Sequence, residues 1–150
     1  MNQSVLTETQ PEKSIIMDQI QKGNADFVFQ GLCRVENGVM IISYSFFKCF
    51  ATEQTYDIIT QVFKNKLEEL LTEVGKFIIY INMERFSINQ FTKHQKYFIK
   101  MSTMFQELYP DKLEKCYLYN TSRTITNIYS LMNMIVDKDT IQKVEIVYAG

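Results

Sequence analysis

The sequence predicts an α/β fold: a mainly parallel sheet with an antiparallel edge hairpin and flanking helices. Three observations predict it. Strand-like and helix-like patterns alternate after residue 39, which is typical of βαβ units. Asn37-Gly38 separates two runs rich in Phe, Val, Ile and Tyr, and both residues tolerate the positive φ of a tight hairpin turn. Phe77–Ile81 is a continuous apolar run, which suits a strand in a sheet covered on both faces.

The first half of the chain predicts a hairpin, a helix and a central strand. Ala25–Arg34 and Val39–Phe47 are the two hairpin strands. Thr52–Glu73 is an amphipathic helix, because its apolar residues recur every three or four positions, and Gly75 ends it. Lys76–Asn82 is the next strand.

The second half continues the alternation. Ser87 stands where it can cap a helix over Ile88–Leu108. Lys115–Asn120 and Val144–Ala149 are the last two strands. Between these strands, a helix over Arg123–Val136 is apolar almost all round, which indicates deep burial or contact with an apolar ligand.

A polar N-terminal extension over residues 1–24 precedes a single domain over residues 25–150. Pro11 and Gly23 bracket a short helix candidate within the extension. Its narrow apolar stripe could dock on its own domain or on a partner, and it consists of Ile15, Ile16, Met17 and Ile20.

Composition excludes several classes of protein. A net charge of −1 argues against a nucleic-acid partner. Cys33, Cys49 and Cys116 form no CxxC pair, so reduced thiols are the simplest interpretation. The start has no apolar signal-peptide region, and no apolar run approaches the roughly 20 residues that span a bilayer. We therefore expect an intracellular protein without a transmembrane segment, cytoplasmic or part of a large complex.

No catalytic, metal-binding or phosphate-binding signature is present, and there are only 5 glycines and 1 histidine. His94 falls between Phe91 and Phe98 on the apolar face of its helix, where we interpret it as a histidine at the edge of the core with its hydrogen bonds satisfied, and not as a catalytic base. We expect no catalytic residue, no metal and no cofactor apart from a possible bound lipid. The protein is therefore not expected to be an enzyme.

Three lysines gather on one side of the predicted helix over residues 88–108. Lys93, Lys96 and Lys100 fall within about 60° of one another at 100° per residue. The simplest interpretation is a solvated face, and the alternative is contact with an anionic membrane or an acidic protein.

Motifs in the second half carry a family resemblance. Tyr109-Pro110-Asp111-Lys112 closes the long helix, Asn120-Thr121-Ser122 ends a strand, and the segment 137–144 reads Asp-x-x-Thr-x-x-Lys-Val before the last strand. With these motifs the chain from about Phe29 to Gly150 resembles the CRAL-TRIO family of lipid-binding domains, which includes phosphatidylinositol transfer proteins.

The resemblance implies a lipid site. Asp111, Thr140 and Lys143 match the positions that contact the inositol phosphate in phosphatidylinositol-binding members, so they are the candidate head-group residues. Taken alone, they would be a turn residue, a helix-end residue and a surface residue. The acyl tail would lie along the helices, and the candidate residues of this apolar pocket are Phe91, Phe98, Met101, Phe105, Tyr129 and Met132.

The sequence departs from the family at both ends, as a minimal form would. Only some 24 polar residues precede the hairpin where the family has a helical lobe, and the chain ends at Gly150, before the family's gating helix. An apolar pocket without a lid forfeits about 2.5 kcal/mol of binding per 100 Å² left in water.

Two hypotheses follow. The favoured one is a non-catalytic CRAL-TRIO-like module that acts as an interaction or structural subunit of a larger assembly, with a protein partner covering its apolar surface. The alternative is a protein that binds or transfers a lipid, either a phosphoinositide or another hydrophobic ligand.

Overall fold

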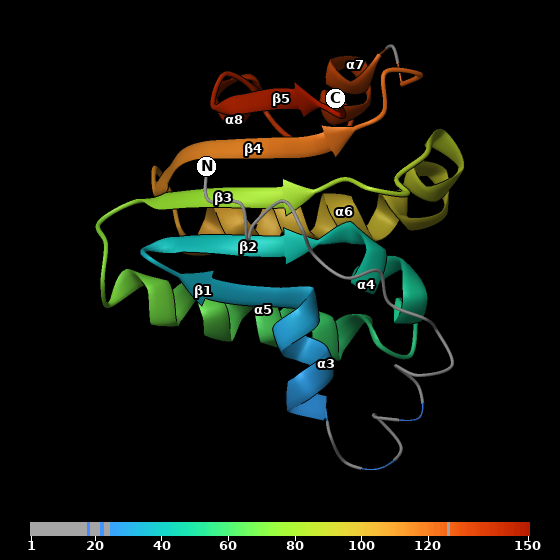
Figure 1. Ribbon diagram of the computed structural model, residues 1–150. Helices are drawn as coiled ribbons and strands as arrows, with labels where there is room; N and C mark the ends of the chain where they lie inside the picture. The colour runs from blue at the N-terminus through green and yellow to red at the C-terminus, as the bar shows by residue number, and fades with distance from the viewer. Residues whose placement is uncertain (1–17, 19–21, 23–24, 126) are drawn as a thin grey trace.

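The computed structural model describes residues 18, 22, 25–125 and 127–150. A five-stranded sheet in the order β1-β2-β3-β4-β5 forms its centre (Figure 1). β1 and β2 are antiparallel, and every later pair is parallel. The predicted fold class, a mainly parallel sheet with an antiparallel edge hairpin, is confirmed. The strands are β1 (Cys33–Glu36), β2 (Val39–Ser43), β3 (Phe77–Asn82), β4 (Leu113–Thr121) and β5 (Val144–Tyr148).

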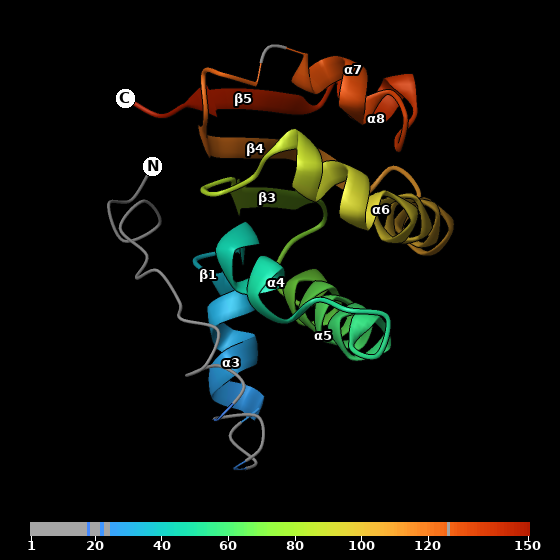
Figure 2. The same ribbon diagram turned by 90° about the vertical axis from the view of Figure 1, so that its right-hand side faces the viewer.

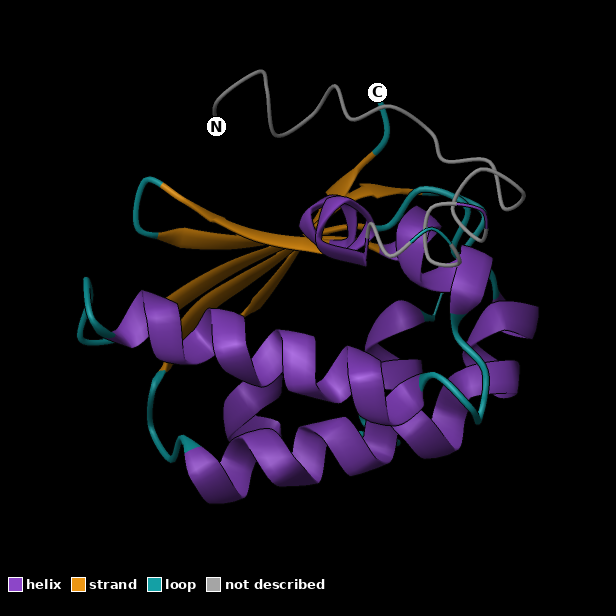
Figure 3. Ribbon diagram, turned by 90° about the horizontal axis from the view of Figure 1, so that it is seen from below, coloured by secondary structure: helices purple, strands orange, loops and turns teal. Residues whose placement is uncertain are grey.

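Helices cover one face of this sheet. The two long helices, α5 and α6, lie side by side against it, and the short helices α7 and α8 lie on the same side next to β4 and β5 (Figures 2 and 3). Among the described residues, no long helix crosses the opposite face. The helices are α3 (Ala25–Leu32), α4 (Tyr44–Phe50), α5 (Tyr56–Leu71), α6 (Ile88–Leu108), α7 (Ile128–Met132) and α8 (Lys138–Ile141).

The hairpin turn lies where the sequence predicts it. Glu36 pairs with Val39, and the two residues between them have φ angles of 53° at Asn37 and 78° at Gly38. Both angles fall in the left-handed region, which asparagine and glycine enter more readily than other residues.

The prediction of a strand over Ala25–Arg34 is wrong, because most of this segment forms α3. Val28 and Leu32 lie four residues apart and both are fully buried, which is helical spacing. Gly31 lets α3 approach α4 closely, since a Cβ atom there would fall on the ring of Phe46. Only the end of the predicted strand belongs to β1.

The prediction of a strand over Val39–Phe47 is too long. The Ser43 side chain accepts a hydrogen bond from the Phe46 N–H at 3.4 Å, so it caps a helix at this point. The buried residues Tyr44, Phe47 and Phe50 then recur every third position, which gives α4 one apolar face.

The two long helices are close to their predicted ranges. α6 spans the predicted residues, and the Ser87 side chain caps it by accepting from the Gln90 N–H at 3.2 Å. α5 begins later than predicted, because Thr55 folds the preceding residues into a turn. Its hydroxyl accepts from the Thr52 N–H and donates to the Phe50 carbonyl, both at 2.8 Å.

The prediction of one helix over Arg123–Val136 is also wrong, since among the described residues of this range only Ile128–Met132 is α-helical. Polar side chains at its start bond locally instead of allowing a longer helix. The Thr124 N–H donates to the Ser122 hydroxyl at 3.3 Å, and the two hydroxyls lie 2.8 Å apart. The helix candidate bracketed by Pro11 and Gly23 falls outside the described residues.

The alternation of β3 separates two faces with different contents. Phe77 and Ile79 point toward the helices and join the main core. Tyr80 points the other way, where its ring stacks on Tyr117 of β4 at 4.9 Å and packs near the fully buried Tyr119. This second face therefore has an aromatic row of its own.

Candidate functional site

An apolar cavity of about 260 Å³ lies between the sheet and the helices α5 and α6. Two of its polar lining residues have hydrogen-bond partners outside the cavity: Tyr44 donates to Gln90 at 2.8 Å, and the Tyr97 hydroxyl lies 3.0 Å from the Thr60 hydroxyl. The cavity can therefore accept an apolar group. It is lined by Met40, Ile42, Tyr44, Phe47, Phe63, Leu67, Ile79, Ile81, Tyr97, Phe98, Met101, Ser102 and Phe105.

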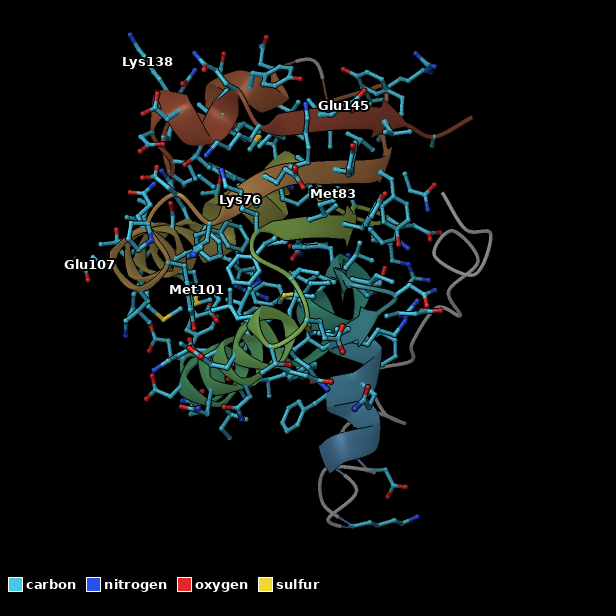
Figure 4. All side chains as sticks on the ribbon, turned by 90° about the vertical axis from the view of Figure 1, so that its left-hand side faces the viewer. Lys76, Met83, Met101, Glu107, Lys138 and Glu145 are labelled. Carbon is cyan, nitrogen blue, oxygen red and sulfur yellow. The ribbon has the colours of Figure 1, made fainter. Side chains whose placement is uncertain are left out.

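Strand register explains why the sheet side of this cavity is apolar. Met40 of β2 pairs with Ile79 of β3, and Ile42 pairs with Ile81. Since alternate residues of a strand share a face, these four side chains form one patch beneath the helices. Figure 4 shows Met101 of α6 between α6 and α5, and its side chain lines the cavity together with this patch.

A smaller polar pocket of about 170 Å³ contains all three predicted head-group residues. Asp111 lies in the turn after α6 with a φ angle of 58°, while Thr140 belongs to α8 and Lys143 precedes β5. The structure thus brings together residues that lie some 30 positions apart in the sequence. Gln106, Tyr109, Asp137 and Asp139 also line this pocket.

The charges of this pocket are mostly negative. Asp111, Asp137 and Asp139 bring three carboxylates, whereas Lys143 is the one basic residue among the lining residues. Asp137 caps α8 by accepting from the Thr140 N–H at 2.8 Å. The Thr140 hydroxyl and N–H, and then the charge of Lys143, hold the pKa of Asp137 below its usual range. Two of the three predicted residues therefore already interact with a carboxylate of the protein.

Phe105 connects the two pockets, because it lines both of them. Phe77 packs against it with ring centroids 5.7 Å apart and also meets the edge of Tyr109 at 5.5 Å. Tyr109 in turn donates to Glu68 of α5 at 2.8 Å. An aromatic layer thus stands between the apolar cavity and the polar pocket.

The predicted apolar pocket residues divide into two groups. Phe98, Met101 and Phe105 line the cavity, which the apolar stripe of their helix indicated. The other three do not line it. Phe91 is buried beside Phe98, Met132 packs against the main core, and Tyr129 on α7 is 45% exposed.

The sheet and α5 contribute a part of the cavity that was not predicted from the sequence. The sequence does indicate which strand residues share a face. Residues 40 and 42 alternate with 39 and 41 along one strand, and residues 79 and 81 alternate with 78 and 80 along the next. Periodicity shows which residues share a face, but not where a void remains between two packed faces.

His94 has 1% of its surface exposed, so it lies inside the core and not at the edge where we predicted it. Its Nδ1 atom lies 2.6 Å from the Tyr56 hydroxyl, and its Nε2 atom has no hydrogen-bond partner among the described residues. The rings of Phe47 and Phe98 surround it. Burial and the nearby Lys93 lower its pKa, so the ring is neutral near pH 7.

Other reactive chemistry is scarce in the part of the chain that the structure describes. No three His, Cys, Asp or Glu side chains there lie together as a metal site would require. Cys116 is buried, which raises the pKa of its thiol to about 12, and burial raises the pKa of Cys33 still further. None of the described helices is both long and apolar enough to cross a bilayer.

The fold and the apolar cavity define a binding module of the α/β class. The family model of the CRAL/TRIO domain matches residues 39–149, and the chain belongs to this family, whose domains are of the lipid-binding type. A search of curated proteins gives no match to this chain.

Proposed function

We propose that this protein binds a small or single-chain hydrophobic ligand in the cavity between the sheet, α5 and α6. The apolar lining of that cavity carries the proposal. Its volume of about 260 Å³ is slightly below the roughly 300–1,000 Å³ of ordinary ligand pockets. One acyl or isoprenoid chain fits this volume better than the two chains of a phospholipid.

The polar pocket supports a neutral head group rather than a phosphorylated one. The pocket is lined by three carboxylates and one ammonium group, so its net charge is negative. This negative charge repels a phosphate dianion and disfavours its binding. A hydroxyl head group would instead donate a hydrogen bond to Asp111 or Asp139. Of the lipid classes, a phosphoinositide is therefore the less favoured ligand.

Isothermal titration with dodecanol and dodecyl phosphate tests the proposal, because the two ligands share a chain and differ in head-group charge. We expect dodecanol to bind at least about tenfold more tightly, which corresponds to about 1.4 kcal/mol. Ile81→Phe fills the cavity and should abolish binding. Ile78→Phe makes the same substitution on the opposite face of β3 and should leave dodecanol binding intact.

Three results would refute this proposal. The first is that neither ligand binds, and the second is that Ile78→Phe weakens binding as much as Ile81→Phe. The third is that dodecyl phosphate binds more tightly than dodecanol and that this difference depends on Lys143. This result would indicate that the polar pocket binds a phosphorylated head group. A Lys143→Ala variant that still binds dodecanol normally would support the neutral head group.

A non-catalytic role is part of the proposal. Among the described residues, the buried histidine contacts a tyrosine whose pKa is raised by burial, and the buried thiols are protonated near pH 7. Neither arrangement supplies an activated nucleophile beside a base.

A second candidate function, an interaction module within a larger assembly, is supported by exposed apolar side chains around β5. This strand is at the edge of the sheet, where its unpaired backbone groups can pair with another chain. Val147 and Tyr148 of the strand are exposed, as are Tyr129 and Met134 near α7. Such a patch is typical of a surface that a partner covers.

A further inference from the structure

We infer that the outer face of α6 is a docking surface for anionic phospholipid membranes. This inference goes beyond ligand binding in the cavity and does not depend on it. The surface, called here the α6 lysine face, consists of Lys93, Lys96 and Lys100 together with the exposed Ile88 and Ile99.

The geometry of α6 places these five side chains on one side. At 100° per residue the lysines fall within about 60°, and the two isoleucines lie next to them on the solvent side of the helix. Ile88 is 54% exposed and Ile99 is 39% exposed. Exposed isoleucine beside lysine is the pattern of an interfacial helix, in which apolar side chains enter the membrane and ammonium groups meet phosphates.

The lysines are available for an anionic partner. Within the described part of the chain, the ion pairs involve other residues, and no carboxylate pairs with Lys93, Lys96 or Lys100. The chain as a whole has a net charge of −1, so this positive charge is local. Glu107 lies two turns beyond Lys100 and points outward from α6 (Figure 4), so the positive face ends before it.

A groove beside the α6 lysine face has room for lipid head groups. It has a volume of about 580 Å³ and lies between α6 and the segment that joins α4 to α5. Lys93 and Lys96 line it together with the hydroxyl of Thr52 and the amide of Gln54, and Glu53 is the one carboxylate among its lining residues. Two ammonium groups and several neutral donors suit the phosphate of an anionic phospholipid.

The same helix also lines the apolar cavity from its opposite side, through Phe98, Met101 and Phe105. Docking on the α6 lysine face would thus bring one wall of the cavity against the membrane. An acidic protein would satisfy the lysines but not the two exposed isoleucines, so the membrane is the occupant that accounts for both.

Flotation of the full-length chain with vesicles tests the inference. We expect binding to vesicles of phosphatidylcholine with about one third phosphatidylserine, weaker binding to pure phosphatidylcholine, and a decline with added salt. Replacing Lys93, Lys96 and Lys100 by Gln should weaken binding at least about tenfold. The matched control replaces Lys76, Lys112 and Lys115 by Gln, which removes the same charge from another surface and should have little effect.

Further arms separate this inference from its alternatives. Replacing Ile88 and Ile99 by Ser should also weaken vesicle binding, whereas polyglutamate should neither bind nor compete. No binding to the anionic vesicles, an equal loss in both lysine variants, or binding of polyglutamate in place of vesicles would overturn it. Dodecanol titration of the lysine variant without vesicles should be normal, so a failure here is distinct from a failure of the ligand proposal.

Discussion

Phe77→Ala is expected to lower the free energy of unfolding by about 3–5 kcal/mol, the usual range for removing a buried phenyl ring. Phe77 begins β3, is completely buried, and packs on Phe105 and Tyr109 with centroids less than 6 Å away. The total free energy of unfolding of an ordinary domain is about 5–15 kcal/mol, so this one substitution removes a large part of the stability.

Urea unfolding followed by circular dichroism measures this effect. The matched control is Ile58→Ala on α5, because Ile58 is half exposed and its truncation should change stability by less than about 0.5 kcal/mol. Equal losses in the two variants would contradict the view that the aromatic layer is the structural centre of the fold.

The aromatic layer also separates the two pockets, so Phe77→Ala has a second expected result. Since Phe105 lines both pockets and rests on Phe77, removal of the ring should leave space that joins them. We expect the variant to accept a longer alcohol than the wild type does. Titration with alcohols of increasing length, at a temperature where the variant is folded, measures this change.

Sequence patterns predicted the second half of the sheet and the long helices well. Ile88–Leu108 has a sustained apolar stripe and a serine cap, and both signals come from the segment itself. The segments that were predicted wrongly form short elements: α3, α4 and α7. Ala25–Leu32 contains strand-favouring residues, but its burial against α4 and β1 selects the helix. In a short apolar segment, local propensity does not distinguish a helix from a strand, and tertiary packing selects one of them.

The candidate site could be predicted in part for a similar reason. Asp111, Thr140 and Lys143 were identified from their motif, and they do line one pocket. The charge of that pocket was also readable, because Asp137 and Asp139 stand beside Thr140 in the sequence. What the sequence did not indicate is that all three carboxylates line one small pocket with Lys143, since the place of Asp111 depends on the turn after α6.

Lowering the pH from about 7.5 to about 5 should destabilise the protein through His94. In the unfolded chain histidine has a pKa near 6.5, whereas burial and Lys93 lower the pKa of His94 in the folded protein. Below pH 6.5 the unfolded state therefore binds more protons. The contribution of neutral His94 is complete above that pH and is lost as the pH falls toward the folded pKa.

The surroundings of His94 offer no compensation for a positive charge. Tyr56 of α5 contacts the His94 ring, and Tyr97 of α6 stacks on Tyr56. Burial raises the pKa of both tyrosines, so they stay neutral in this range. In the protonated ring both nitrogens carry a hydrogen and share the positive charge. Nε2 has no hydrogen-bond partner among the described residues that could stabilise this charge. The pKa of Asp137 is lowered from its usual value of 3.8, so this residue changes the stability of the protein only at a pH near or below 3.8, outside this range.

Two variants separate the titration of His94 from its packing. His94→Phe keeps a ring against Phe47 and Phe98 and should lose only about 1 kcal/mol with the Tyr56 hydrogen bond, but its stability should hardly change over this pH range. Tyr56→Phe deletes the same hydrogen bond and keeps the titrating ring, so it should retain the fall with acid. Urea unfolding across the pH series measures both, and a His94→Phe protein that still loses stability as the wild type does would assign the acid sensitivity to other groups.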